Sequence, residues 1–351
     1  MSKKIGVGIL GATGYGAGEL LRLLASHNDA QVVSVVSGSQ AGEAVTVAHQ
    51  HLAGFFPELR FDAELQAGRF SEFAEKIVFA ALPHGKSAGA IAKLSVLPEF
   101  TEFRFIDLSG DFRLQNVAER TKHYPEAAAG DEIRNRFVYG LTEANRKKIA
   151  NARFIANPGC LSSACALAAL PLMTPEFRGK IVFDAKTGSS GGGKALAETM
   201  HHPLRHSNVN AYKILEHRHE PEIRETLGDV SGDRIETVFV PHLLPVSRGI
   251  FATAYLTLDR VAETPELQER YRKFYAASPL IRIRAGSPDL QSVVGSNFCD
   301  ISVFARGTQV VAMAALDNLV KGMAGQAIQN MNVMTGHADD FCLRQPPLGL
   351  I

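Results

Sequence analysis

Cys160 stands in a local sequence that suits a nucleophilic thiol. It follows Asn157-Pro158-Gly159 and begins the run Leu161-Ser162-Ser163-Ala164, which is typical of a helix start. A helix N-terminus lowers the pKa of a thiol, and its N–H groups can stabilise the oxyanion formed when sulfur attacks a carbonyl. The pattern therefore predicts a reactive cysteine. The alternative of equal weight is a buried structural cysteine, the usual fate of a free thiol.

A thiolate nucleophile needs a neighbouring group that moves protons. The segment His217-Arg218-His219-Glu220-Pro221-Glu222 crowds two histidines and an arginine at an expected helix start, which suits proton transfer and anion binding. A second cluster, His201-His202-Pro203-Leu204-Arg205, has no carboxylate or cysteine nearby, so we expect no metal site there. Cys165, Cys299 and Cys342 lack such a context and are expected to be inert.

Two further segments are candidates for binding a substrate anion. The glycine-rich run that ends at Lys194 follows an expected strand but lacks the spacing of a Walker A motif. It is interpreted either as a flexible loop or as an anion cradle near the cysteine. The segment 107–113 follows another strand at its carboxyl end, where ligands bind in parallel sheets. Ser109 and Arg113 are its candidates, although Arg113 could equally form a surface ion pair.

The N-terminal glycine-rich turn predicts a dinucleotide site. Residues 11–18 (GATGYGAG) lie between an expected strand and an expected helix, where backbone N–H groups suit a pyrophosphate. A glycine at position 11 permits the tight turn, and one at position 14 allows close backbone approach. The alternative is a plain glycine-rich turn. The candidate cofactor contacts are Gly11, Thr13, Gly14, Tyr15 and Gly16.

The end of the second expected strand indicates which dinucleotide binds. Val36 leads into Ser37, Gly38 and Ser39, with no acidic residue to bond the ribose hydroxyls of NAD. Small hydroxyl residues accommodate a 2′-phosphate, so NADP(H) is the expected cofactor. The alternative is that Ser37 and Ser39 only form a turn.

The elements that must position these residues fall into two groups. In the first, strands alternate with helices, which predicts a doubly wound parallel sheet. After residue 157 the pattern predicts a mixed α+β domain with a mostly antiparallel sheet. The expected strands are 5–10, 31–36, 77–82, 103–107 and 153–156, then 180–185, 235–240, 250–258, 302–305 and 310–315. The expected helices include 87–94, 162–172, 265–275 and a last one at 317–331.

Composition excludes several classes of protein. The 37 basic and 36 acidic residues among 351 leave a net charge of +1, so we expect no nucleic-acid partner and no anionic membrane partner. We expect no transmembrane segment, because no charge-free apolar stretch is long enough, and no secretory signal. Four scattered cysteines indicate a reducing, cytoplasmic setting.

Taken together, these segments resemble the N-acetyl-γ-glutamyl-phosphate reductase family, NADP-dependent enzymes of arginine biosynthesis. The resemblance implies a Rossmann domain, 1–157 plus 317–351, with an inserted catalytic and oligomerisation domain, 158–316. The inserted domain would be of the glyceraldehyde-3-phosphate dehydrogenase type. The matching stretches, in family order, are GATGYGAGEL, LPHG, DLSGDFRL, NPGC, GSSGGGK, HRHEPEI, PHLLPVSRGI, GSNFCDI and DNLVKGMAGQAIQNMN.

The resemblance also implies roles for single residues. Cys160 falls on the nucleophile, His217 on the acid/base residue and Asn318 on a cofactor contact. The implied reaction reduces an acyl phosphate with NADPH, through a cysteine thioester and a thiohemiacetal, to a semialdehyde. The implied assembly is a homodimer or homotetramer. The expected substrate contacts are Ser109, Arg113, Lys194, Arg218 and His219.

Several features keep alternatives open. Leu161 stands where a tyrosine is common, and Lys194 replaces the usual arginine, which loses a bidentate fork. The segment 201–205 is similar to one in relatives of lysine biosynthesis that reduce a carrier-linked aminoadipyl phosphate. A non-catalytic NADP-sensing regulator is an alternative from another class, and Cys160 argues against it. The aspartate-semialdehyde dehydrogenase family fits the HRHEPEI segment poorly.

Overall fold

The computed structural model describes residues 4–127, 129–174, 177, 179–231 and 235–350. The chain forms two compact units. Unit 1 comprises Met1–Pro158 and Met323–Leu343, and unit 2 comprises Gly159–Gly322 and Arg344–Ile351. The division that the resemblance implies, 1–157 plus 317–351 and 158–316, stays a prediction.

Unit 1 is built on a seven-stranded sheet with the strand order β3-β2-β1-β4-β5-β7-β6. Every neighbouring pair is parallel, which confirms the expected doubly wound α/β architecture. The order reverses direction at β1, so the carboxyl ends of β1 and β4 flank a switch point suited to ligands. The strands are β1 Ile5–Leu10, β2 Ala30–Val36, β3 Phe61–Asp62, β4 Glu75–Ala80, β5 Arg104–Asp107, β6 Phe137–Tyr139 and β7 Phe154–Ala156.

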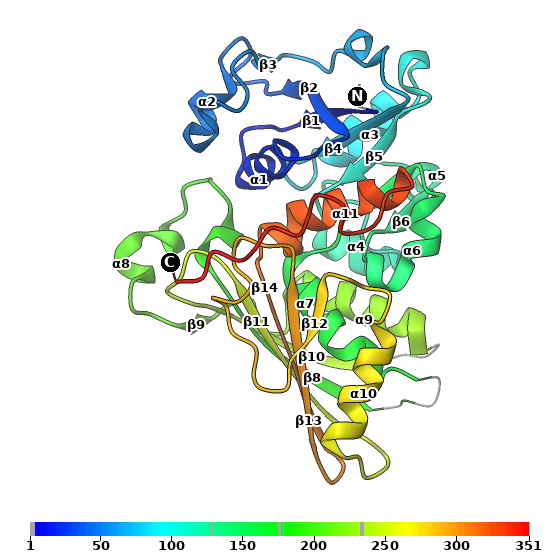
Figure 1. The fold of residues 1–351 in the computed structure, drawn as a ribbon, viewed down its shortest axis with the longest axis vertical. Coiled ribbons are helices and arrows are strands. Elements are labelled where there is room, and N and C mark those ends of the chain that lie inside the picture. The colour runs from blue at the N-terminus through cyan, green and yellow to red at the C-terminus, as the bar shows by residue number, and fades with distance from the viewer. Residues whose placement is uncertain (1–3, 128, 175–176, 178, 232–234, 351) are drawn as a thin grey trace. The chain divides into compact units, whose positions relative to one another are not determined.

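Helices surround this sheet, and the last helix of the chain joins them. It contacts α6, α1 and β5, so this helix is part of unit 1 (Figure 1). The helices of unit 1 are α1 Tyr15–Leu24, α2 Val45–Ala48, α3 Ser87–Ser95, α4 Val117–His123, α5 Asp131–Arg134, α6 Thr142–Ala150 and α11 Gly325–Met334.

Unit 2 is built on a second seven-stranded sheet, with the order β12-β13-β14-β11-β8-β10-β9. The central run β13-β14-β11-β8 is antiparallel, whereas β8 and β10 pair in parallel. The expected mixed α+β domain with a mostly antiparallel sheet is therefore confirmed. Its strands are β8 Lys180–Thr187, β9 Asn210–Ala211, β10 Glu236–Leu243, β11 Ile250–Thr257, β12 Ile281–Ile283, β13 Cys299–Arg306 and β14 Gln309–Leu316.

Three long helices pack against this sheet. The helix α7 contacts β11 and β14, α9 contacts β10, and α10 contacts β13 (Figure 1). Buried and exposed residues alternate along β8, which is the period of a strand with one covered face. The helices of unit 2 are α7 Cys160–Ala169, α8 His202–Arg205, α9 His219–Ser231 and α10 Thr264–Phe274.

Two helix starts differ from the expected ones by about two to three residues. The helix expected at 162–172 begins at Cys160 and turns into a 3₁₀ turn at Leu170–Leu172, because Pro171 has no N–H to continue an α-helix. The helix expected from residue 317 begins with a π-helical turn at Val320–Ala324, followed by α11. None of the helices in the described part of the chain is long and apolar enough to cross a membrane.

Candidate active site

The glycine turn of unit 1 has the geometry that the sequence predicts. Gly11 has φ +74, and a Cβ there would meet the Ala81 carbonyl oxygen at 2.8 Å, so only glycine fits. Gly14 caps α1, and a Cβ there would meet nothing within 4 Å. Open space above the N-terminus of α1 is what a pyrophosphate requires. This turn therefore fits a dinucleotide, while the contacts of Thr13, Tyr15 and Gly16 with it stay predictions.

Glycine at positions 16 and 18 is required by close packing rather than by space for a ligand. A Cβ at Gly16 would meet the Met323 sulfur at 2.5 Å, and one at Gly18 would meet the His49 ring at 2.8 Å. The His49 Nε2 in turn lies 2.7 Å from the Ala12 carbonyl oxygen. These two glycines therefore let the start of α1 pack closely on its surroundings within unit 1.

The end of β2 presents hydroxyl groups and no unpaired acid. Ser37 Oγ lies 3.5 Å from Ser39 Oγ, and a Cβ at Gly38 would meet nothing within 4 Å. The nearest acid of the adjacent β3, Asp62, accepts two hydrogen bonds from Arg69, at 2.8 and 3.0 Å. A carboxylate neutralised in this way does not repel a 2′-phosphate, which fits the expectation of NADP(H).

The segment after β5 is a buried network within unit 1. Asp107 accepts hydrogen bonds from Ser87 Oγ at 2.5 Å and from Ser109 Oγ at 2.8 Å. Arg113 donates to the Asn157 carbonyl at 2.7 Å and to the Leu108 carbonyl at 3.0 Å. Arg113 is thus buried, and two of its donors lie on backbone carbonyls. The predicted substrate roles of Ser109 and Arg113 stay predictions.

Burial is also the main cause of one large pKa shift in this network. Asp107 is completely buried, and its pKa rises to about 6 because burial disfavours the charged form. The hydrogen bond from Ser87 lowers the pKa, and the nearby charge of Asp111 raises it further. The neutral form of Asp107 is therefore populated at mildly acidic pH.

Cys160 is the first residue of α7 and is partly exposed. Gly322 lies against it, and a Cβ on Gly322 would meet the Cβ of Cys160 at 2.7 Å. The rest of the helix is buried, including Cys165. Burial raises the pKa of the Cys165 thiol and the charge of Cys160 raises it further, so Cys165 stays protonated. The helix therefore carries one accessible sulfur, at its N-terminal end.

Glu222, from the first turns of α9, fixes the start of α7. Its Oε1 accepts a hydrogen bond of 2.6 Å from the peptide N–H of Gly159, the residue that caps α7. Glu222 is 1% exposed. The two helices also pack against each other. A buried carboxylate thus ties the HRHEPEI segment to the cysteine segment.

His217 is buried and held in one orientation. The peptide N–H of His219 donates to His217 Nδ1 at 3.1 Å, so a neutral imidazole carries its proton on Nε2. The rings of Tyr212, His219 and Phe239 lie edge-on to it, with centroids 5.4, 4.7 and 5.4 Å away. This is the arrangement of a positioned proton donor.

One cavity of about 540 Å³ in unit 2 brings the predicted groups together. Cys160, His217, Arg218 and His219 all line it, and so does the buried Leu161. Tyr212 also lines the cavity; burial raises its pKa, the charge of Cys160 raises it further and that of Arg218 lowers it. Lys194 is exposed and is not among the residues that line the cavity.

The glycine-rich loop after β8 is held in shape by Asn318. Backbone hydrogen bonds join residues 188–190 to residues 246–249. Asn318 Nδ2 donates to Ser190 Oγ at 2.9 Å, and its Oδ1 accepts from the Gly249 N–H at 2.8 Å. Asn318 belongs to unit 2, where its amide joins two loops. Its predicted contact with the cofactor stays a prediction.

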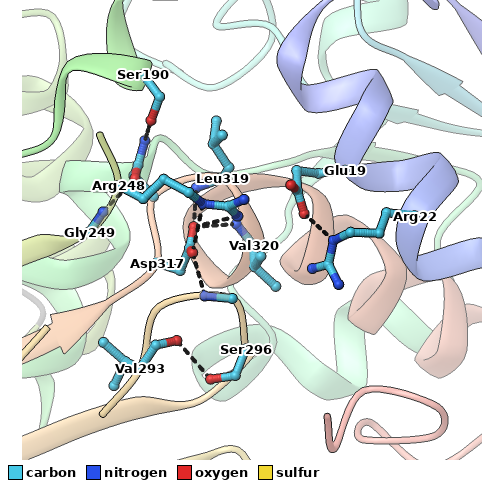
Figure 2. Close-up of polar contacts among 12 residues, drawn as sticks. Glu19, Arg22, Ser190, Arg248, Gly249, Val293, Ser296, Asp317, Leu319 and Val320 are labelled. Atoms are coloured by element: carbon cyan, nitrogen blue, oxygen red, sulfur yellow. Dashed lines mark hydrogen bonds and ion pairs between the residues drawn. The ribbon is translucent and has the colours of Figure 1, made fainter. Parts of the chain in front are cut away.

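The neighbouring Asp317 is the centre of a larger network in unit 2, as Figure 2 shows. Its carboxylate accepts hydrogen bonds from Arg248 at 3.0 and 3.1 Å and from the Gly295 N–H at 2.7 Å. It also accepts from the N–H groups of Leu319 and Val320, at 2.8 and 3.1 Å. This carboxylate therefore satisfies the N–H groups at the start of the π-helical turn, which explains why the helix does not begin at residue 317.

Comparison with known sequences decides the family. The chain is 43% identical to N-acetyl-γ-glutamyl-phosphate reductase of Symbiobacterium thermophilum over 344 residues, 95% of each chain. It is 39% identical to the enzyme of that name from Archaeoglobus fulgidus, over 97% of this chain and 99% of the other. The chain belongs to the N-acetyl-γ-glutamyl-phosphate reductase family. The relatives do not favour the lysine-biosynthesis alternative or a non-catalytic regulator.

Family models and solved structures agree with this membership. Residues 6–152 match the NAD binding domain of semialdehyde dehydrogenases, and residues 160–318 match their dimerisation domain. The fold is similar to aspartate semialdehyde dehydrogenase II from Vibrio cholerae, with a TM-score of 0.68 at 15% identity over 95% of this chain and 99% of the other. It is also similar to the enzyme from Candida albicans, with a TM-score of 0.64 at 15% identity over 97% and 100%. The chain is an oxidoreductase related to the semialdehyde dehydrogenases, and it carries their dimerisation domain.

Sequence reasoning did not select Glu222 and Asp317 as organising residues. Glu222 lies in the HRHEPEI segment, but its partner Gly159 is 63 positions away. Asp317 precedes a run that looks helical throughout. An acidic residue just before an apolar helical run is a capping signal, and it was available at Asp317. No local signal points from Glu222 to Gly159.

Proposed function

We propose that this chain reduces N-acetyl-γ-glutamyl phosphate with NADPH to N-acetylglutamate 5-semialdehyde and phosphate, a step of arginine biosynthesis. The observation that carries the proposal is the shared cavity of Cys160 and His217 at the start of α7. It occurs in a chain that is about 40% identical, over nearly its full length, to reductases of that name.

The cofactor part of the proposal rests on unit 1. Gly11 and Gly14 leave the N-terminus of α1 open to a pyrophosphate, and Ser37 and Ser39 suit a 2′-phosphate. NADPH, when bound, supplies the hydride. Gly38 leaves open space beside these hydroxyls.

In the first step, the Cys160 thiolate attacks the acyl carbon, and the C–O bond to phosphate breaks. A thioester and free inorganic phosphate result. The position of Cys160 as the first residue of α7 directs the positive end of the helix dipole toward sulfur, which favours the thiolate. The hydrogen bond from Gly159 to Glu222 keeps that helix end in place.

In the second step, the thioester carbon would accept the hydride, while His217 Nε2–H donates a hydrogen bond to the oxygen that becomes negative. The product would be a thiohemiacetal anion on Cys160. The oxyanion then re-forms the carbonyl, the C–S bond breaks, and the semialdehyde leaves with the thiolate restored. The hydrogen bond from His219 N–H to Nδ1 keeps Nε2 as the atom that carries this proton. Arg218 lines the same cavity as Cys160 and is the cation that suits the departing phosphate.

The assembly and the compartment are part of the same proposal. The dimerisation-domain match over residues 160–318 supports a homodimer or a homotetramer built from it. Val182 and Tyr255 pair across β8 and β11 and are 36% and 44% exposed, so this sheet offers apolar surface to a second copy. A cytoplasmic location suits a catalytic thiol, which needs reducing surroundings.

The reverse assay tests the proposed reaction. N-acetylglutamate 5-semialdehyde, phosphate and NADP should give phosphate-dependent NADPH formation, measured by absorbance. A carrier-linked aminoadipate semialdehyde should give much less. Activity with the carrier-linked aldehyde alone would transfer the chain to the lysine-biosynthesis reaction. NADP binding without turnover of either aldehyde would instead support a sensor.

A further inference from the structure

Arg205 brings a second cation to the catalytic cavity. It is the last residue of the short helix α8 and lines the same cavity of about 540 Å³ as Cys160 and His217. Thr199, Met200 and Leu204 line the cavity near it in sequence, so its wall is largely apolar. Arg205 therefore adds a charge to the same cavity from a segment other than HRHEPEI.

The guanidinium of Arg205 is only partly satisfied by the protein. Its Nη2 donates to Asn210 Oδ1 at 2.6 Å, which holds the group in place. Its Nε and Nη1 atoms are buried and have no hydrogen-bond partner among the residues that the structure describes. No carboxylate in that part of the chain forms an ion pair with Arg205.

Two other arginines of the chain donate hydrogen bonds to acceptors that the protein itself supplies. The Arg248 guanidinium makes two hydrogen bonds to Asp317, at 3.0 and 3.1 Å. Arg113 places two donors on backbone carbonyls. A buried cationic donor without an acceptor costs folding free energy, so its retention in a ligand cavity indicates an acceptor supplied by the ligand.

The proposed substrate has two anionic ends. Its phosphate is bonded to the carbon that Cys160 attacks, and Arg218 lines the same cavity as Cys160. Its other anion is a free carboxylate, separated from the acyl carbon by two methylene groups and the carbon that bears the acetamido group. We propose that Arg205 binds this carboxylate and selects substrates that carry it. This inference rests on the proposed function and identifies the recognition group of the same site.

The test compares two aldehydes in the reverse reaction: N-acetylglutamate 5-semialdehyde and 4-acetamidobutanal, which lacks only the carboxylate. The native chain should prefer the carboxylated aldehyde by about 10- to 100-fold in kcat/KM, the usual effect of a hydrogen bond to a charged group. Arg205→Met should lose this preference, mainly through a higher KM for the carboxylated aldehyde. Its kcat/KM for 4-acetamidobutanal should stay within about twofold of native, since that substrate never used Arg205.

Two further variants make the result specific. Lys213 lines the same cavity and is exposed, so Lys213→Met removes a charge of the same sign and should keep the preference. Arg205→Lys should keep part of it, because charge remains while the planar fork is lost. If Lys213→Met lost the preference as fully as Arg205→Met, any positive charge in the cavity would account for it, and the proposal would be overturned.

Other outcomes overturn it in distinct ways. An equal loss of kcat/KM for both aldehydes in Arg205→Met would make Arg205 structural. A higher KM for phosphate with the preference intact would make it a phosphate site. Calorimetric titration of Cys160→Ser with the two aldehydes measures the same preference without turnover. A native chain that binds the carboxylated aldehyde through Arg205 but does not turn it over would refute the proposed function alone.

Discussion

The glycine turn of unit 1 and the cysteine cavity of unit 2 are built by different means. The turn is one contiguous strand–turn–helix segment, and its fitness for a ligand comes from backbone conformation and missing side chains at Gly11 and Gly14. The cavity is built from side chains, and its lining residues extend from Cys160 to Leu243. Its geometry depends on contacts between segments distant in sequence, such as Glu222 with Gly159.

The difference separates what each region contributes. Backbone N–H groups at a helix start recognise any pyrophosphate of the right shape, so the turn binds without chemistry. Placed side chains can accept a covalent bond and move protons, so the cavity carries the reaction. Variants in one region should therefore change cofactor binding, and variants in the other should change turnover. Variants of Cys160, His217 and Gly14 test this separation, and a variant of Asp107 tests the stability of unit 1.

The largest effect is expected for Cys160→Ser. A serine hydroxyl is not ionised at neutral pH and is a poorer leaving group, so turnover should fall by about 10⁴-fold or more. NADPH affinity, measured by fluorescence titration, should stay native because the glycine turn is unchanged. Cys342→Ser, which removes the other partly exposed thiol, is the matched control and should keep full turnover. A Cys160→Ser variant with near-native turnover would remove the thioester route.

The next effect is expected for His217→Ala. Loss of the proton donor should lower kcat by about 10²- to 10⁴-fold while NADPH affinity is retained. His219→Ala should have a smaller effect, because the His219 contact with His217 is made by the peptide N–H, which alanine keeps. Initial rates of the reverse reaction measure both. If His219→Ala were the inactive variant, the roles within this pair would be exchanged.

Much of unit 1 could be predicted from sequence because its signals are local. The strand, the Gly11 turn and the start of α1 are adjacent, and the alternation of strands with helices identifies a parallel sheet. The short edge strands β3 and β9, of two residues each, gave no periodicity to detect. Their existence depends on a neighbouring strand that offers hydrogen bonds.

The cavity could be predicted only in part. Cys160 and the two histidines were found from residue type and from the helix start, and the family resemblance chose His217. The ties that hold them were not found, because the Glu222–Gly159 bond and the Asn318–Ser190 bond, 128 positions apart, join separate segments. Burial could not be read from the sequence either: Arg113 is 6% exposed, and two of its donors lie on backbone carbonyls.

A third effect concerns stability and belongs to unit 1. The pKa of Asp107 is about 6 in the folded chain and 3.8 in its ordinary state, so the folded state holds its proton to higher pH. The free energy of unfolding should therefore fall as pH rises from 4.5 to 7, by about 2 kcal/mol from this group. In Asp107→Asn, which cannot titrate, this contribution should vanish.

Urea unfolding of the native chain and of Asp107→Asn at both pH values measures the difference. The exposed Asp259→Asn, in unit 2, controls for removal of a carboxylate and should follow the native pH dependence. Equal slopes in the native chain and in Asp107→Asn would show that Asp107 ionises without penalty inside the unit. Turnover at pH 7 is not part of this test, because Ser109 is a candidate substrate contact that bonds to Asp107.

The smallest effect, and the sharpest test of the separation, is expected for Gly14→Val. Gly14 has φ −78, which any residue adopts, and a Cβ there meets nothing within 4 Å, so folding should lose less than about 1 kcal/mol. The new side chain would occupy the space above the start of α1, and NADPH affinity should fall at least about tenfold, or about 1.4 kcal/mol. Iodoacetamide labelling of Cys160 should be unchanged.

Gly130→Val is the matched control, since Gly130 also caps a helix of unit 1 and also has open space around its missing Cβ. It should have the same small effect on stability and no effect on NADPH affinity. Native NADPH affinity in Gly14→Val would mean that the open cradle is not the pyrophosphate site. The turn would then be an ordinary βα connection. Unit 1 would no longer provide a cofactor site made by the backbone, to be contrasted with the cavity of side chains in unit 2.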